Sequence, residues 1–175
     1  EQVEPSIDWK KELNLPEQSL IVSMLASIYK YKDHKTLLKA WAIVQQSLKN
    51  ETLRPVLILA GTFKGMENEL KVVCYDLRIA DSVYFIGATL NTNTLIEQSS
   101  LVVHSSNKEG CPNAVLEAMA LGKPVVATKI SGNIHALGQN YAEFCFNQEN
   151  DFEDLASKII YILKSLILKM IIDKN

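Results

Sequence analysis

The sequence predicts a doubly wound α/β fold with a parallel sheet, because strand and helix patterns alternate along it and the strands are apolar throughout. Its 175 residues, 47% of them hydrophobic, suffice for one ordinary core. We find no internal repeat, low-complexity tract or long linker that would divide it. A single domain covering residues 1–175 is therefore expected.

Each apolar run that predicts a strand is followed by a segment whose apolar residues recur at helical spacing. The predicted strands cover residues 20–26, 55–60, 83–86, 101–104 and 124–128, and the predicted helices cover 36–44, 66–77, 92–98, 112–121 and 151–172. A short apolar segment, 142–146, leads into the last helix. Strands that are apolar on both faces need helices on both sides of the sheet, and the right-handed crossover rule makes this a Rossmann-like sheet. Its ligands should bind beyond the carboxyl ends of the strands.

Charge and cysteine content exclude several classes of function. The formal net charge of -2 and pI near 6.0 provide no broad positive field, so nucleic acid is not an expected partner. Cys74, Cys111 and Cys145 are odd in number and far apart, which predicts reduced core thiols. No pair of histidines has metal-ligand spacing, so no metal site is expected. Residues 1–5 show none of the features of a signal peptide, which favours a cytoplasmic location.

Two carboxylates mark the most informative segment. Glu109 lies in the loop before the helix 112–121 and Glu117 in its early turns, and the helix is otherwise apolar, which predicts that it is buried. A buried carboxylate is costly without a partner, and a ligand hydroxyl is one such partner. Pro112 and Gly122 suit the two ends of the helix, so its N-terminal amides should face the crevice above the sheet and favour a phosphate there. The plainer alternative is a solvated loop charge and an ordinary helix-surface residue.

The segment EGCPNAVLEAMALGKPVVATKISGN, residues 109–133, resembles the signature of the retaining GT-B glycosyltransferases of group 1, or family 4. The resemblance runs from about residue 20 to residue 162, with KDHKTLLKAW, LILAG and VYFIG in the family's order and spacing. It implies the C-terminal half of a GT-B fold, which binds a nucleoside diphosphate sugar for transfer to a saccharide or lipid-linked acceptor. The N-terminal domain of the same protein would supply the acceptor site, so this domain is expected to be inactive alone.

The resemblance also implies roles for individual residues. Glu117 would accept hydrogen bonds from the ribose diol, and Glu109 would lie against the transferred sugar. Lys32 occupies the position of a lysine that binds the donor diphosphate and stabilises its charge as the sugar departs, so Glu109 and Lys32 are the expected catalytic residues. Gly87 ends the third strand, where backbone groups of the family meet the nucleobase. The loop expected to hold sugar and phosphate comprises Gly110, Cys111, Pro112 and Asn113. No cofactor and no metal is implied, and the plainer alternatives are a solvated lysine and a turn glycine.

Two departures from the family pattern leave other functions open. A common diphosphate-binding arginine is replaced by Ser27, and His135 stands where many members have a carboxylate. These changes admit a non-catalytic nucleotide-binding or scaffold domain, and a nucleotide-sugar epimerase half is a further alternative. His34, expected in the loop before the first helix, and His104, at the end of a strand, are expected to be structural.

The last helix carries more Ile and Leu than one face of a helix on this domain needs. In the family a C-terminal helical segment reaches back to the N-terminal domain, which would cover such a surface. The alternative is contact with a membrane surface at the cytoplasmic face, with Lys158, Lys164, Lys169 and Lys174 flanking an interfacial helix.

Overall fold

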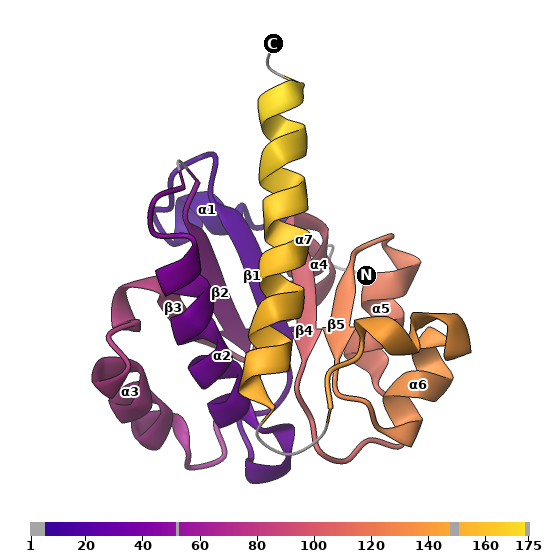
Figure 1. Ribbon diagram of the computed structural model, residues 1–175. Helices are drawn as coiled ribbons and strands as arrows, with labels where there is room; N and C mark the ends of the chain where they lie inside the picture. Colours follow the sequence, from indigo (N-terminus) through magenta and orange to yellow (C-terminus); the bar gives the residue numbers. More distant parts are fainter. Residues whose placement is uncertain (1–5, 52, 148–150, 174–175) are drawn as a thin grey trace.

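Five parallel strands form one sheet in the order β3-β2-β1-β4-β5 (Figure 1). The computed structural model describes residues 6–51, 53–147 and 151–173. The strands are β1 (Leu20–Leu25), β2 (Pro55–Ala60), β3 (Val83–Gly87), β4 (Leu101–His104) and β5 (Val125–Ala127). The chain moves outward from β1 to β3 and then returns to place β4 on the other side of β1. The topological switch point, where such sheets bind ligands, therefore lies between β1 and β4.

Helices cover both faces of the sheet. The elements α2 (His34–Ser47), α3 (Glu67–Asp76) and α7 (Phe152–Ile172) share the core of one face, and α1 (Trp9–Glu12), α4 (Thr92–Gln98) and α5 (Asn113–Ala120) share the core of the other. A further helix, α6 (Ser131–Leu137), packs beside α5. Three 3₁₀ turns complete the described elements: η1 (Lys30–Lys32), η2 (Ala80–Ser82) and η3 (Gln139–Phe144).

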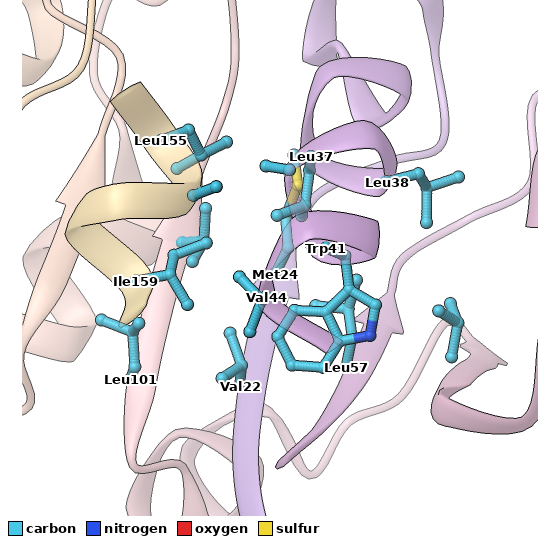
Figure 2. Packing of buried hydrophobic residues seen from close by; sticks show 14 of the residues in the cluster. Val22, Met24, Leu37, Leu38, Trp41, Val44, Leu57, Leu101, Leu155 and Ile159 are labelled. Atoms are coloured by element: carbon cyan, nitrogen blue, oxygen red, sulfur yellow. The ribbon is translucent and has the colours of Figure 1, made fainter. Parts of the chain in front are cut away.

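The larger core lies between β1, α2 and α7. Figure 2 shows Trp41 and Val44 of α2 above the sheet, with Leu155 and Ile159 of α7 facing them. All six residues of β1 are buried, because helices pack against both of its faces. Trp41 is fully buried and its indole nitrogen donates a hydrogen bond to Ser82 Oγ at 3.0 Å, so its one polar atom is satisfied.

The predicted parallel α/β fold is confirmed, and β2, β4 and α4 have the predicted bounds. The helices α1 and α6 were not predicted. The helix predicted from residue 36 begins at His34, because the Asp33 side chain accepts a hydrogen bond from the Thr36 amide and caps its first turn. Most of residues 142–146 belong to η3, and Phe146 forms a single parallel bridge with Thr128. In the described part of the chain no helix is long and apolar enough to cross a bilayer.

Candidate functional site

A pocket of about 310 Å³ opens beyond the carboxyl ends of β1, β2 and β3, beside the first turns of α5. It is therefore where a doubly wound sheet is expected to bind its ligand. The pocket is lined by Leu25, Ala26, Ser27, Ala60, Gly61, Thr62, Ala88, Thr89, Thr92, Asn113, Ala114 and Glu117. Two of the sequence-predicted site residues, Asn113 and Glu117, thus face the same pocket.

The helix that carries Glu117 is not buried as predicted. Within α5 only Val115 and Ala118 are buried, whereas Leu116 and Met119 are 40% and 37% exposed and Glu117 is itself exposed. The apolar sequence misled the prediction because one face of α5 packs on the sheet and the other is open. Glu117 therefore does not need a ligand to offset burial, but its carboxylate lines the pocket with its hydrogen-bonding capacity unused by any described residue.

Glu109 lies in a cluster of charged side chains in the loop between β4 and α5, four residues before Asn113, and neither Glu109 nor Lys32 is among the residues that line the pocket. Its carboxylate accepts a hydrogen bond from Lys32 Nζ, and His104 Nε2 lies 2.8 Å from the same oxygen, Oε1. Only 9% of the Glu109 side chain is exposed, so the charges are largely shielded from water. Burial acts to raise the pKa of Glu109, but the hydrogen bonds from His104, Lys32 and Ser106 outweigh it and lower the pKa to about 2. The two expected catalytic residues, Glu109 and Lys32, are therefore in direct contact.

The loop that carries Lys32 is held by the loop after β4. Asn107 donates its backbone N–H to the Tyr31 carbonyl at 2.8 Å, and the Ser105 hydroxyl donates to the Lys32 carbonyl at 3.0 Å. The Lys32 ammonium also lies 5.2 Å from the centre of the Tyr31 ring. These bonds join the loops at the switch point, so Lys32 is positioned by its neighbours and is not a freely solvated lysine.

The predicted sugar and phosphate loop runs from this cluster into α5. Gly110, Cys111 and Asn113 are exposed, whereas Pro112 is buried and immediately precedes the helix. Cys74 and Cys145 are buried, as predicted for core thiols, but Cys111 is exposed, so that prediction was wrong for Cys111. Its position in a loop between Glu109 and α5 explains the difference, since a loop at the rim of a pocket has no layer above it.

Glycines bring the rim loops close together. Gly61 has φ +156°, and a Cβ there would lie 2.0 Å from the Ala26 carbonyl oxygen. Gly61 also donates its N–H to the carbonyl of Gly87 at 2.8 Å. Gly87 is the last residue of β3, and its carbonyl oxygen accepts the hydrogen bond from Gly61 in the loop after β2. The next residues, Ala88 and Thr89, line the pocket.

A second close approach joins Glu109 to α6. A Cβ on Gly132 would lie 2.4 Å from the Glu109 carbonyl oxygen, so the start of α6 contacts the Glu109 backbone directly. Asn133, fully buried, donates a hydrogen bond to the Thr128 carbonyl at 2.9 Å. His135, the residue at the altered family position, is exposed on the same helix. Ser27, at the other altered position, lies in the pocket with its hydroxyl 3.1 Å from Thr62 Oγ1.

The two remaining histidines lie closer to the site than was predicted. His34 is the first residue of α2 and is 3% exposed, and its Nε2 has no hydrogen-bond partner among the described residues. Burial, and then the nearby His104 and Lys32, lower its pKa to about 4. His104 contacts the Glu109 carboxylate, which sequence reasoning missed. Its position could have indicated this contact, because His104 is the last residue of β4 and β4 borders the switch point.

The whole segment from Ser6 onward matches the sequence pattern of one family, described as glycosyl transferases group 1, over residues 6–175. The chain belongs to the group 1 glycosyltransferase family. It is 29% identical, over 156 residues, to an uncharacterized glycosyltransferase of Haemophilus influenzae, covering 89% of this chain and 42% of that protein. The chain therefore spans less than half the length of this relative.

Solved structures show the same fold. WaaG, a glycosyltransferase involved in lipopolysaccharide biosynthesis, superposes with a TM-score of 0.79 at 20% identity, over 95% of this chain and 44% of WaaG. Anabaena HepE, crystallised with UDP-glucose, superposes with a TM-score of 0.76 at 23% identity, over 90% of this chain and 42% of HepE. The predicted GT-B type of Rossmann-like sheet is thereby confirmed for this group 1 glycosyltransferase domain. In the described ranges no three His, Cys, Asp or Glu side chains gather as a metal site, and metal independence stays a prediction.

Proposed function

We propose that this chain is the donor-binding domain of a retaining glycosyltransferase of family 4, which transfers a sugar from a nucleoside diphosphate to a saccharide or lipid-linked acceptor. The observation that carries the proposal is the pocket that places Glu117 and Asn113 of α5 opposite the loops after β1, β2 and β3. A concave site with a few converging polar groups at the edge of a parallel sheet is the usual form of a nucleotide site.

Glu117 binds the ribose in this proposal. A carboxylate accepts hydrogen bonds from two adjacent hydroxyls, and Glu117 lines the pocket with no described partner that would compete for its oxygens. The base then lies against Ala88 and Thr89, which follow β3 on the far wall of the pocket. Backbone groups of these residues would meet the base.

Lys32 and Glu109 act on the diphosphate and the sugar. In the unliganded chain Lys32 is paired with Glu109, so an arriving diphosphate competes with that carboxylate for the ammonium. His104 remains in contact with Glu109 when Lys32 turns toward the phosphates, which limits the repulsion between the carboxylate and the diphosphate. When the bond between the sugar C1 and the diphosphate oxygen breaks, the negative charge left on that oxygen is stabilised by Lys32 and by the amides at the start of α5. The oxygen of the acceptor hydroxyl bonds to C1 on the face that the diphosphate leaves, and its proton passes to the departing diphosphate oxygen, so the anomeric configuration is retained.

The relatives support the class of donor and the need for a second domain. HepE was crystallised with UDP-glucose, which is a nucleoside diphosphate sugar. This chain spans 42% of the Haemophilus relative and 44% of WaaG. The acceptor site and further catalytic groups would therefore come from a separate N-terminal domain of the same protein, which is why the 175 residues alone should bind the donor and turn over almost nothing.

A second candidate is a domain that binds nucleotide without transfer. Ser27 favours it, because its hydroxyl pairs with Thr62 Oγ1 where many family members place a cation on the diphosphate. Of the two positions where the family commonly has a cation, only the one of Lys32 carries a positive charge here. The diphosphate leaving group is therefore stabilised by less positive charge.

Calorimetric titration of the chain with UDP, GDP and ADP, and with their sugar conjugates, tests the proposal. Glu117→Gln should weaken binding of the preferred nucleotide about tenfold to hundredfold, since hydrogen bonds to a charged group contribute about 1.5–3 kcal/mol. Glu109→Gln should weaken the nucleotide sugar more than the nucleotide. Glu153→Gln, an exposed position on α7 away from the pocket, is the matched control. Equal affinities for all four proteins would contradict the assignment, and binding without transfer in a two-domain form would favour the second candidate.

A further inference from the structure

The end of α7 extends beyond the body of the domain. Leu155, Ile159, Leu163 and Ile167 recur every fourth residue and are buried against the sheet and α2. Beyond Ile167 this packing ends, and Leu168, Ile171 and Ile172 are 59%, 49% and 63% exposed. Figure 1 shows the last turns of α7, in yellow, projecting past the sheet. Three large aliphatic side chains are thus left in water at the tip of a projecting helix.

The exposed face of α7 is amphipathic. With about 100° of rotation per residue, Tyr161, Leu168 and Ile172 fall within an arc of about 40° on the side away from the core. Lys164 lies on one flank of this arc, and Lys158 and Lys169 lie on the other. An apolar strip bordered by lysines on both sides is the pattern of a helix that lies in a membrane interface, where lysine stems cover apolar surface and their ammonium groups reach the headgroups.

The charged side chains of this part of α7 are all positive. Residues 155–172 contain three lysines and no acidic residue. Lys158 is paired with Asp154 at 3.3 Å, but within the described ranges no acidic side chain forms an ion pair with Lys164 or Lys169. Two lysines beside the exposed Leu168 and Ile172 are therefore available for anionic groups, although the whole chain has a formal net charge of -2.

Aromatic side chains lie next to the exposed face of α7, on the side of its first turns. Tyr161 and Phe144 line one shallow hollow with Lys158, and the Tyr141 ring lies 6.3 Å from that of Phe144. Tyr141 and Tyr161 are 53% and 68% exposed. Tyrosines with an apolar ring and a polar hydroxyl are favoured at the boundary between hydrocarbon and water.

We propose that the exposed face of α7, formed by Tyr161, Lys164, Leu168, Lys169 and Ile172, binds the surface of an anionic lipid bilayer. A projecting aliphatic tip fits a fluid lipid surface, because lipid can close around a convex shape and needs no matching hollow. The lysines select anionic headgroups, and the aliphatic side chains provide the apolar contact. This surface does not depend on the proposed donor site, because α7 runs away from the pocket. Leu155 lies beside Leu37 in the first turns of α2, and one turn later Ile159 lies near Leu101, at the amino end of β4 (Figure 2). The pocket lies at the opposite, carboxyl ends of the strands.

Sedimentation with vesicles tests this inference. The full chain should bind vesicles of equal parts phosphatidylglycerol and phosphatidylcholine at least about tenfold more tightly than vesicles of phosphatidylcholine alone, and added salt should weaken that binding. The double variant Lys164→Glu with Lys169→Glu should lose the preference for anionic vesicles. Leu168→Ser with Ile172→Ser should reduce binding about tenfold or more on either vesicle.

The matched control is Val72→Ser with Tyr75→Ser, which removes two apolar side chains of α3 that are 59% and 78% exposed. This control should bind vesicles like the unaltered chain, and thermal unfolding should show that all variants are folded. No vesicle binding by the unaltered chain would overturn the inference, and so would an equal loss in the α3 control. A dimer in analytical ultracentrifugation that Leu168→Ser with Ile172→Ser dissociates would identify a second copy as the occupant and also overturn it. Loss of vesicle binding in a two-domain form that includes the N-terminal domain would identify that domain as the occupant and would overturn it as well. Glu117→Gln should leave vesicle binding unchanged, so failure of the donor proposal is distinguishable.

Discussion

His104 Nε2 and Glu109 Oε1 lie 2.8 Å apart, which joins the end of β4 to the loop five residues later. The contact holds the Glu109 carboxylate on one side while Lys32 holds it on the other. A carboxylate with two positively charged or hydrogen-bonding neighbours stays ionised far into the acid range, and its orientation is set before any ligand arrives.

The first prediction concerns Glu109 and acid stability. Its pKa is about 2 in the folded chain, against 4.5 as the ordinary value, so the unfolded chain takes up a proton at higher pH than the folded chain does. The stabilisation is complete above about pH 5 and is lost as the pH falls toward about 2. Glu109→Gln should remove about 1–3 kcal/mol of unfolding free energy at about pH 6 and much less at about pH 2. Urea unfolding across this range measures it, and parallel pH profiles for the two proteins would contradict it.

The second prediction concerns His34, which is buried and has a pKa of about 4 instead of 6.5. The unfolded chain binds a proton near pH 6.5 and the folded chain only near pH 4. The stabilisation from the neutral imidazole is therefore complete above about pH 7 and is lost between about pH 6.5 and about pH 4. His34→Gln should flatten the fall in unfolding free energy over this interval. His135→Gln, an exposed position on α6, is the control and should leave the slope intact.

The third prediction concerns Gly61. A Cβ at this position would overlap the Ala26 carbonyl oxygen, which is backbone and cannot rotate away. Gly61→Ala should therefore lower the unfolding free energy by about 2–4 kcal/mol and impair nucleotide binding, because the loops after β1 and β2 must separate. Gly65→Ala is the control: it also has a positive φ, but a Cβ there meets no atom within 4 Å, so the expected cost is about 1 kcal/mol. Similar melting temperatures for the two variants would argue against a clash.

The fourth prediction concerns the three thiols. Burial raises the pKa of the Cys74 thiol to about 11 and raises that of Cys145, whereas Cys111 is exposed. Iodoacetamide at neutral pH should therefore alkylate Cys111 alone in the folded chain and all three in urea. If the loop 110–113 contacts the donor, a bound nucleotide sugar should slow the labelling of Cys111. Mass spectrometry of peptides after timed quenching measures both effects, and equal labelling with and without donor would remove Cys111 from the binding loop.

The strands could be predicted from the sequence because their signals are local. The run 55–60 is apolar, starts with Pro55 and is followed by Gly61, and it forms β2 with the predicted bounds. The start of α2 was missed, because it depends on Asp33 adopting φ 50° and capping the helix, which leaves no mark in the apolar pattern. The helix α1 is four residues long, too short for a periodic signal. The helix α6 was missed because it begins with Ser131, Gly132 and Asn133, residue types that are typical of turns.

The site was predicted in part. The position of Glu117 at the edge of the sheet could be predicted because its helix follows the fourth predicted strand, but its exposure could not, because Leu116 and Met119 make the helix apolar on several sides. Contact between Lys32 and Glu109 could not be predicted from spacing alone. The two residues are 77 positions apart and meet only because β4 lies next to β1, which returns both loops to the same edge.

The contact between Gly132 and the Glu109 carbonyl brings the main chain of α6 directly against the main chain of the Glu109 loop, with no room for a Cβ between them. A side chain at position 132 would therefore displace the loop that carries Glu109, although the two residues belong to different elements of the fold.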